Sequence, residues 1–205
     1  MRETSTDLRI IRTKESIREA LIDLIEEKGF EAVTVKDITT KARINRGTFY
    51  AHYQDKYDLI AKCQEEFMIG LSQIVKQNLV NIIADLDSNV SPTAPFTVMV
   101  SIFEYLNLNR KFMRAVSGPK GDLNFLTKLK DFMWNTLFVR NEFPLIRQET
   151  LLVPSEYLVS YIASAHMGVV QQWLNGDGKE SPEEMALILS TLTVKGPFVA
   201  AGLKK

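Results

Sequence analysis

Two short helical segments joined by a turn of about three residues restrict the fold of this chain more than any other feature. Thr34 and Asp37 have the spacing of a capping box, in which each side chain accepts a hydrogen bond from the backbone N–H of the other residue. Asn45 is a suitable N-cap for a second short helix that carries residues 46–52. The turn between the two helices falls at residues 42–44. This arrangement predicts a helix-turn-helix.

Apolar residues recur at helical spacing through the rest of the chain. A helix is expected over about 7–28, with one apolar face made by Ile17, Ala20, Leu21, Leu24 and Ile25. Further helices are expected from Asp55 past Ile82 and over about 95–109, 110–117, 122–140, 154–175 and 182–194, the last one starting at Ser181-Pro182-Glu183-Glu184. Residues 87–95 contain two prolines and predict a linker. Because no stretch alternates apolar and polar residues, we expect an all-α fold.

Composition excludes several classes of protein. Of the 205 residues, 45% are hydrophobic and 24% are charged, as in a soluble globular chain. The apolar runs reach about five residues, whereas a membrane-spanning helix needs roughly 20. The first residues lack the apolar core of a signal peptide. Cys63 is the single cysteine and cannot form an internal disulfide, so a reducing, cytoplasmic location is expected.

Basic residues are concentrated around the predicted helix-turn-helix. The whole chain is formally neutral, with 25 basic and 25 acidic residues. Residues 34–56 nevertheless carry a net charge of +3, from five cations (Lys36, Lys41, Arg43, Arg46, Lys56) and two anions (Asp37, Asp55). Such a local excess indicates one small basic face for an anionic partner, not a protein that binds polyanions over its whole surface.

The second short helix has side chains suited to the major groove of DNA, which is about 12 Å wide. Gly47 allows close approach of the backbone, Thr48 offers a hydroxyl and a methyl group, and Arg46 can bind a guanine or a phosphate. The side chains suited to contact phosphates are Tyr50, His52 and Lys56, together with Lys36 from the preceding helix. Phe49 is expected to point into the core.

Residues from about 10 to 65 resemble the DNA-binding domain of the TetR family of transcriptional regulators. The matching string is Phe30…Val33-Thr34-Val35-Lys36-Asp37-Ile38…Ala42-Arg43-Ile44-Asn45-Arg46-Gly47-Thr48-Phe49-Tyr50-Ala51-His52-Tyr53…Lys56…Leu59. The remainder resembles the variable C-terminal domain of that family, with residues 157–174 and 181–185 similar to its last two helices. Arg43 stands where the family usually has a turn glycine. If the turn keeps its left-handed residue, arginine there costs roughly 1 kcal/mol.

The resemblance implies an all-α homodimer. Each subunit would have a three-helix helix-turn-helix domain over 1–56 and a C-terminal helical effector-binding and dimerisation domain over 57–205. The last two long helices would form the dimer interface, and effector binding would shift the fourth helix and change the spacing of the two DNA-reading helices. The positions that match the DNA contacts of the family are Thr34, Lys36, Asn45, Arg46, Gly47, Thr48, Tyr50, His52 and Lys56.

Large apolar side chains in the C-terminal half are candidates for the lining of an effector pocket, because such pockets are mostly apolar. They are Met99, Phe103, Phe112, Met113, Phe132, Met133, Trp134, His166 and Trp173. Taken singly, each of these residues fits an ordinary helical core better than a pocket, and Trp173 is also suited to the dimer seam.

Catalytic and metal-binding motifs are absent from the sequence. Two histidines and one cysteine lack the ligand spacing of a zinc site, and the glycine-containing turns lack the pattern of a phosphate loop. We therefore expect no enzyme activity, metal, cofactor or membrane partner. The expected function is a dimeric, ligand-responsive regulator, in particular a repressor, that binds a pseudo-palindromic operator in double-stranded DNA. Two alternatives stay open: a coactivator of the same fold that acts through a protein partner, and a helical ligand-binding or adaptor module without a DNA role.

Overall fold

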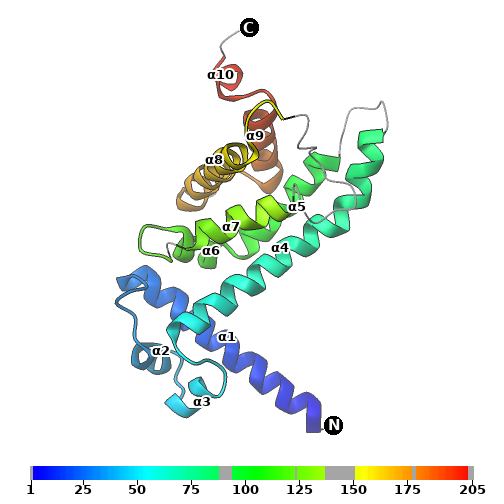
Figure 1. The fold of residues 1–205 in the computed structure, drawn as a ribbon. Helices are drawn as coiled ribbons and strands as arrows, with labels where there is room; N and C mark the ends of the chain where they lie inside the picture. The colour runs from blue at the N-terminus through cyan, green and yellow to red at the C-terminus, as the bar shows by residue number, and fades with distance from the viewer. Residues whose placement is uncertain (1, 88–93, 123, 137–150, 177–178, 203–205) are drawn as a thin grey trace. The chain divides into compact units, whose positions relative to one another are not determined.

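The computed structural model describes residues 2–87, 94–122, 124–136, 151–176 and 179–202, and the regular structure of these residues is helical throughout (Figure 1). In chain order the helices are α1 (Arg2–Lys28), α2 (Val35–Lys41), α3 (Arg46–Tyr50), α4 (Lys56–Asp87), α5 (Ala94–Leu108), α6 (Arg110–Ser117), α7 (Phe125–Trp134), α8 (Ser155–Asn175), α9 (Pro182–Val194) and α10 (Pro197–Ala200). The prediction of an all-α fold is confirmed. Among the described helices, none is both long and apolar enough to cross a bilayer.

Most helix boundaries agree with the sequence-based expectations, and three places differ. Helix α1 begins at Arg2, well before the expected start near residue 7. Helix α7 ends at Trp134, and the expected continuation to residue 140 falls largely outside the described residues. The short α10 was not expected, because four residues are too few to show helical periodicity. The expected linker over 87–95 lies mostly outside the described residues.

Contacts along the chain define two compact units. Unit 1 comprises Met1–Phe67 and Lys111–Leu123, and unit 2 comprises Met68–Arg110 and Asn124–Lys205. The boundary falls inside α4, after Phe67, and inside α6, after Arg110. Unit 1 therefore contains α1, α2, α3 and the first part of α4, joined by most of α6 from far along the chain.

The core of unit 1 is built from the apolar faces of these helices. The fully buried side chains include Ile17, Leu21 and Ile25 from α1, Ile38 from α2, Phe49 from α3, Leu59 and Phe67 from α4, and Phe112 and Met113 from α6. The ring of Phe112 lies 5.6 Å from that of Phe67 and 5.0 Å from the guanidinium of Arg18. Lys111 of α6 forms an ion pair with Asp23 of α1 at 2.5 Å, and this pair also attaches α6 to α1.

Unit 2 packs α5 against α9, α7 against α8, and α8 against α9. Phe103 of α5 and Trp173 of α8 meet edge to face with their ring centroids 5.4 Å apart. One guanidinium nitrogen of Arg110 donates to the carbonyl oxygens of Trp173, Leu174 and Gly176, at 2.9–3.1 Å. Arg110 therefore satisfies the last carbonyls of α8, where a cation is also favoured by the helix dipole.

Candidate nucleic-acid interface

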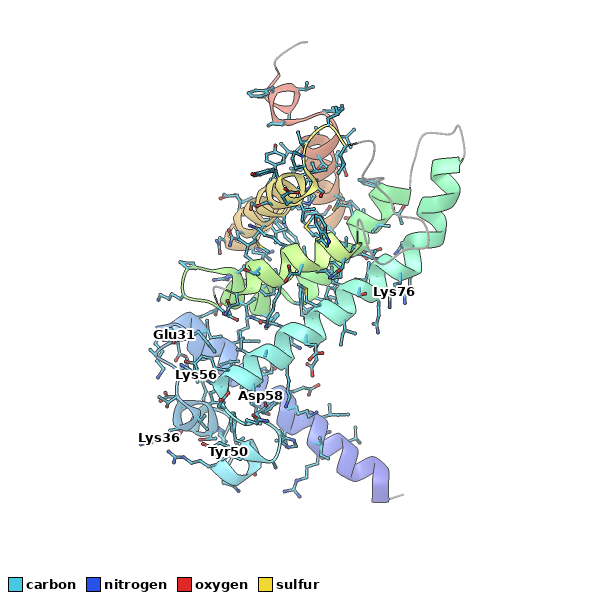
Figure 2. The ribbon with its side chains drawn as sticks, in the orientation of Figure 1. Glu31, Lys36, Tyr50, Lys56, Asp58 and Lys76 are labelled. Carbon is cyan, nitrogen blue, oxygen red and sulfur yellow. The ribbon has the colours of Figure 1, made fainter. Side chains whose placement is uncertain are left out.

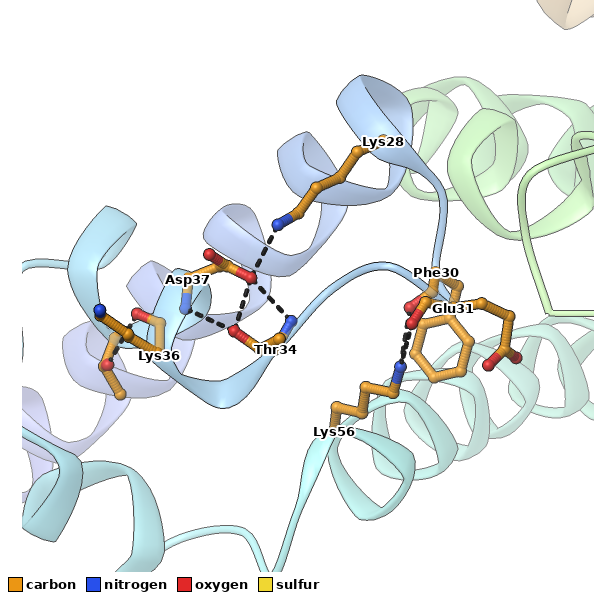
Figure 3. A network of polar contacts seen from close by, with 8 residues as sticks. Lys28, Phe30, Glu31, Thr34, Lys36, Asp37 and Lys56 are labelled. Atoms are coloured by element: carbon orange, nitrogen blue, oxygen red, sulfur yellow. Dashed lines mark hydrogen bonds and ion pairs between the residues drawn. The ribbon is translucent and has the colours of Figure 1, made fainter.

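Helix α2 starts at the predicted capping box. The Asp37 N–H donates to Thr34 Oγ1 at 3.2 Å, and the Thr34 N–H donates to Asp37 Oδ2 at 2.9 Å. Lys28, at the end of α1, donates to the same carboxylate oxygen at 2.7 Å (Figure 3). The hydrogen bond from Lys28, followed by those from Thr34, holds the pKa of Asp37 well below its ordinary value of 3.8. The carboxylate thus ties the start of α2 to the end of α1.

The turn between α2 and α3 keeps the left-handed residue that the family pattern implies. Arg43 has a φ of 55°, and it is the only non-glycine residue with positive φ among the described residues. Backbone bonds close the turn, with the N–H of Arg43 donating to Thr40 O at 3.2 Å and that of Ile44 to Thr39 O at 3.0 Å. The Arg43 side chain is exposed. The turn therefore has the expected conformation, at the cost of placing a residue with a Cβ in the left-handed region.

Helix α3 begins at the predicted N-cap and presents its first turn to solvent. Asn45 Oδ1 accepts from the Thr48 N–H at 2.7 Å and from the Thr48 hydroxyl at 3.1 Å. Gly47 is exposed, and the one heavy atom that an added Cβ would crowd is Asn45 Oδ1, at 3.2 Å. Phe49 is 0% exposed and anchors the opposite side of the helix in the core. The amino end of α3 is therefore open to a partner.

The predicted DNA-contacting residues differ in exposure. The exposed ones are Thr34, Lys36, Asn45, Arg46, Gly47 and Tyr50, and the half-buried ones are Thr48, His52 and Lys56. Lys36 and Tyr50 lie on neighbouring helices at one end of unit 1 (Figure 2). Tyr50 is 55% exposed although its ring meets Phe49 edge to face, with the centroids 5.5 Å apart. All of these side chains come from one stretch of the sequence, residues 34–56, within unit 1.

Lys56, predicted to contact phosphate, has intramolecular partners. Its ammonium group donates to the carbonyl oxygens of Phe30 at 3.0 Å and Glu31 at 2.8 Å (Figure 3). It also lies 4.9 Å and 5.1 Å from the ring centroids of Phe30 and Tyr57. Lys56 therefore braces the start of α4 against the loop between α1 and α2. An ammonium group has three N–H donors, so one remains for a phosphate.

The predicted effector-pocket residues do not all lie in one unit. Phe112 and Met113 are buried in unit 1, whereas the other candidates belong to unit 2. In unit 2, Met99, Phe132, Met133 and Trp134 are half-buried. His166 of α8 lies 3.0 Å from the Thr193 hydroxyl of α9, and burial lowers the pKa of its imidazole.

A groove in unit 2 runs beside α8 and the start of α9. Its volume is about 710 Å³, and its lining includes Gly168, Gln172, Trp173, Lys179 and Ile188. Trp173 is thus the one predicted effector-pocket residue that lines this groove. Within the described ranges, no cluster of three or more histidine, cysteine, aspartate or glutamate residues could hold a metal ion.

Two ion pairs that organise the interface were not predicted from the sequence. Lys41 at the end of α2 pairs with Glu27 of α1, and Lys28 pairs with Asp37. The partners are fourteen residues apart in the first pair and nine in the second. Spacing within one helix could not reveal them, because local patterns concern residues three or four apart.

The fold and the exposed start of α3 define a helix-turn-helix DNA-binding protein. Comparison with known proteins specifies the family. Residues 17–63 match the pattern described as "Bacterial regulatory proteins, tetR family", and residues 93–195 match "Transcriptional regulator C-terminal region". The chain belongs to the TetR family of transcriptional regulators, and the predicted resemblance is confirmed.

Curated relatives are similar to this chain over only part of its length. The uncharacterized HTH-type regulator YxbF of Bacillus subtilis is 40% identical over 60 residues, which are 29% of this chain and 16% of YxbF. The transposon Tn10 TetC protein of Escherichia coli is 32% identical over 82 residues, which are 40% of this chain and 36% of TetC. The chain therefore matches well under half the length of these relatives.

Solved structures extend the similarity of fold over nearly the whole chain. A TetR transcriptional regulator from Streptococcus agalactiae has a TM-score of 0.60 at 22% identity, covering 93% of this chain and 98% of the other. NalD of Pseudomonas aeruginosa, described as the secondary repressor of the MexAB-OprM multidrug efflux pump, has a TM-score of 0.61 at 18% identity, covering 91% and 97%.

Proposed function

We propose that this protein is a homodimeric repressor that binds a pseudo-palindromic operator through α3 and releases it when a small-molecule effector binds. The observation that carries the proposal is the exposed first turn of α3, with Arg46 and Gly47 in solvent and Phe49 in the core. A helix that enters a major groove needs a slender end beside hydrogen-bonding side chains. Membership of a family of transcriptional regulators supports the same role.

Within this proposal, Arg46 reads a base and the other polar residues position the duplex. The Arg46 guanidinium has the geometry to bind guanine O6 and N7 together. The complete set of proposed DNA contacts is Thr34, Lys36, Asn45, Arg46, Gly47, Thr48, Tyr50, His52 and Lys56. The side chains of Thr34 and Asn45 already cap helices, so their contacts to DNA would be made beside those capping bonds.

Dimerisation is proposed to use α8 and α9, the last two long helices. Large apolar side chains stay exposed on both, among them Tyr157 and Tyr161 of α8 and Leu187 and Ile188 of α9. Exposed apolar side chains gathered on neighbouring helices are typical of a subunit interface. A dimer of this kind would present its two α3 helices about 34 Å apart, one helical turn of DNA.

The proposed effector is a small, largely apolar molecule bound by the part of the chain after residue 56. Support comes from the half-buried Met99, Phe132 and Met133, and from the Phe103–Trp173 pair, which belongs to the same unit. In this proposal, residues 1–56 bind DNA, and residues 57–205 bind the effector and form the dimer. Because a repressor acts where its operator DNA is, the proposed location of the protein is the cytoplasm.

The test is a footprint of the full-length protein on the intergenic DNA beside its own gene, followed by affinity measurements over a range of salt concentrations. With three to five phosphates contacted per subunit, log Kd should change with log salt with a slope of about 5 to 9. Arg46→Ala should blur the preference at one base position by about 1–3 kcal/mol. A slope near zero, or unchanged base preference in the Arg46 variant, contradicts the corresponding part of the proposal.

Transcription from the same promoter, with and without the gene, distinguishes a repressor from a coactivator. Loss of the gene should raise transcription if the protein represses. Lower transcription without the gene indicates an activator, and no shift of any duplex from the region indicates a module without a DNA role.

A further inference from the structure

The first turns of α1 extend beyond the core of unit 1. Residues 8–16 contain no buried side chain, and the first buried one is Ile17, which is 0% exposed. At a rise of about 1.5 Å per residue, Arg12 lies about 8 Å and Arg9 about 12 Å beyond Ile17 along the helix axis. The similarity to the TetR pattern begins only at residue 17, so it does not cover this segment.

Three cationic side chains in this extension form no ion pair among the residues whose side chains the structure describes. Arg9, Arg12 and Lys14 are exposed, and none forms an ion pair within the described part of the chain. The one carboxylate among residues 8–16 is that of Glu15. At about 100° per residue, Arg9 and Arg12 lie within about 60° of each other around the helix axis. The two guanidinium groups therefore share one face of α1.

The extension and α3 lie toward the same side of unit 1. In Figure 1, the amino end of α1 and helix α3 both lie at the lower side of this unit, with α3 to the left, whereas α2 packs beside the carboxyl-terminal half of α1. A duplex that meets the exposed start of α3 continues on either side of the groove that α3 occupies. The next feature that such a duplex offers to unit 1 is its sugar-phosphate backbone.

We propose that Arg9 and Arg12 of α1 bind phosphates of the DNA that flanks the sequence read by α3. This inference rests on the proposed function, since it requires α3 to bind DNA. The charge of the two side chains complements the phosphate backbone, and guanidinium groups bind phosphate oxygens bidentately.

The exposed aliphatic residues of the same segment fit a protein partner less well. Leu8, Ile10 and Ile11 are all at least 38% exposed. At about 100° per residue, however, they are spread over about 160° of the helix circumference and form no single stripe. A helix that docks on a protein surface needs apolar residues at spacings of three and four along one face. In contrast, Arg9 and Arg12 lie on one face of the helix.

The experiment compares two operator duplexes, one that ends at the half-sites and one with about ten further base pairs on each side, one helical turn. The proteins are the full-length wild type, Arg9→Gln with Arg12→Gln, and Lys76→Gln as a control. Lys76 is an exposed cation of unit 2 (Figure 2). Glutamine keeps the helix propensity close to that of arginine, so α1 should remain folded. Circular dichroism and sedimentation check the helix content and the oligomeric state.

For wild type we expect the longer duplex to bind about tenfold more tightly. A dimer would lose four phosphate contacts in the double variant, so the salt slope on the longer duplex should fall by about 3 to 4. The double variant should bind the short duplex with the same affinity as wild type. The Lys76→Gln control should bind both duplexes as wild type does.

Two results overturn the proposal while leaving operator binding intact. One is a double variant that binds both duplexes as wild type does. The other is equal affinity of the wild-type protein for both duplex lengths, together with a changed oligomeric state when Leu8 and Ile11 are replaced by alanine. That result would assign the extension to contact with a second copy of the chain. Wild type that binds neither duplex refutes the proposed function itself, and with it this inference.

Discussion

Replacement of Lys56 by methionine tests whether this residue acts as a brace within unit 1. Methionine keeps most of the apolar stem and removes the ammonium group, which donates to two backbone carbonyls and lies about 5 Å from two rings. Hydrogen bonds from a charged donor contribute about 1.5–3 kcal/mol each, and exposed cation–π contacts about 0.5–1 kcal/mol. One of the carbonyls, that of Glu31, is exposed and can bind water instead. We therefore expect a net loss of about 2 kcal/mol in the free energy of unfolding.

The assay is urea unfolding followed by circular dichroism, at one fixed protein concentration because a dimer's stability depends on it. Lys36→Met is the matched control, since Lys36 is an exposed cation in the same unit whose side chain has no hydrogen bond or ion pair in the described structure. The control should unfold within about 0.5 kcal/mol of wild type and yet lower the salt slope of DNA binding. If Lys56→Met is as stable as wild type, the brace is not a stabilising interaction and the reasoning is refuted.

Three further predictions concern unit 1. Arg43→Gly should raise the free energy of unfolding in urea by about 0.5–1 kcal/mol. Glycine removes the strain of a Cβ at positive φ, and its greater freedom in the unfolded chain offsets part of this gain. A lower free energy of unfolding would contradict the prediction. Asp37 has a lowered pKa in the folded state, so its contribution to stability is present above pH 3.8 and should be lost as the pH falls through the folded value. Thermal unfolding measured from pH 7 to well below pH 3.8 should show this loss, and Asp37→Asn should show a shallower one. Phe112→Ala should cost about 3–5 kcal/mol, since Phe112 is 2% exposed against Phe67; a change below 1 kcal/mol would exclude the α6 segment from the core.

Local hydrogen bonds were the most predictable part of this protein. The predicted capping box at Thr34, the helix start at Ser181 and the N-cap at Asn45 are confirmed, and Ser181 also forms a capping box with Glu184. Each of these bonds joins residues three positions apart, so both partners can be recognised in the sequence. At the start of α4, Asp55 accepts from the Asp58 N–H, but the reciprocal bond is shifted by one residue, because Asp58 accepts from the Gln54 N–H. Such one-residue shifts are decided by the exact path of the turn.

Contacts between distant segments could not be predicted in the same way. Lys56 meets carbonyls 25 and 26 residues earlier in the chain, and spacing suggested only a phosphate contact. The assignment of Phe112 and Met113 to unit 1 depends on how α6 packs, and nothing in their own neighbourhood indicates it. An apolar residue at helical spacing predicts burial, but the pattern does not say which helix will cover it.

By itself, the sequence determined most of the helices, their capped starts, the helix-turn-helix and the family, because periodicity, capping and turn chemistry are properties of neighbouring residues. Tertiary structure alone decided which cations are free for a partner: Lys56 is engaged by the loop between α1 and α2, whereas Arg9 and Arg12 extend beyond the core without ionic partners in the described residues. The physical reason is that exposure and pairing depend on which segments meet in space, and those segments lie far apart in the chain.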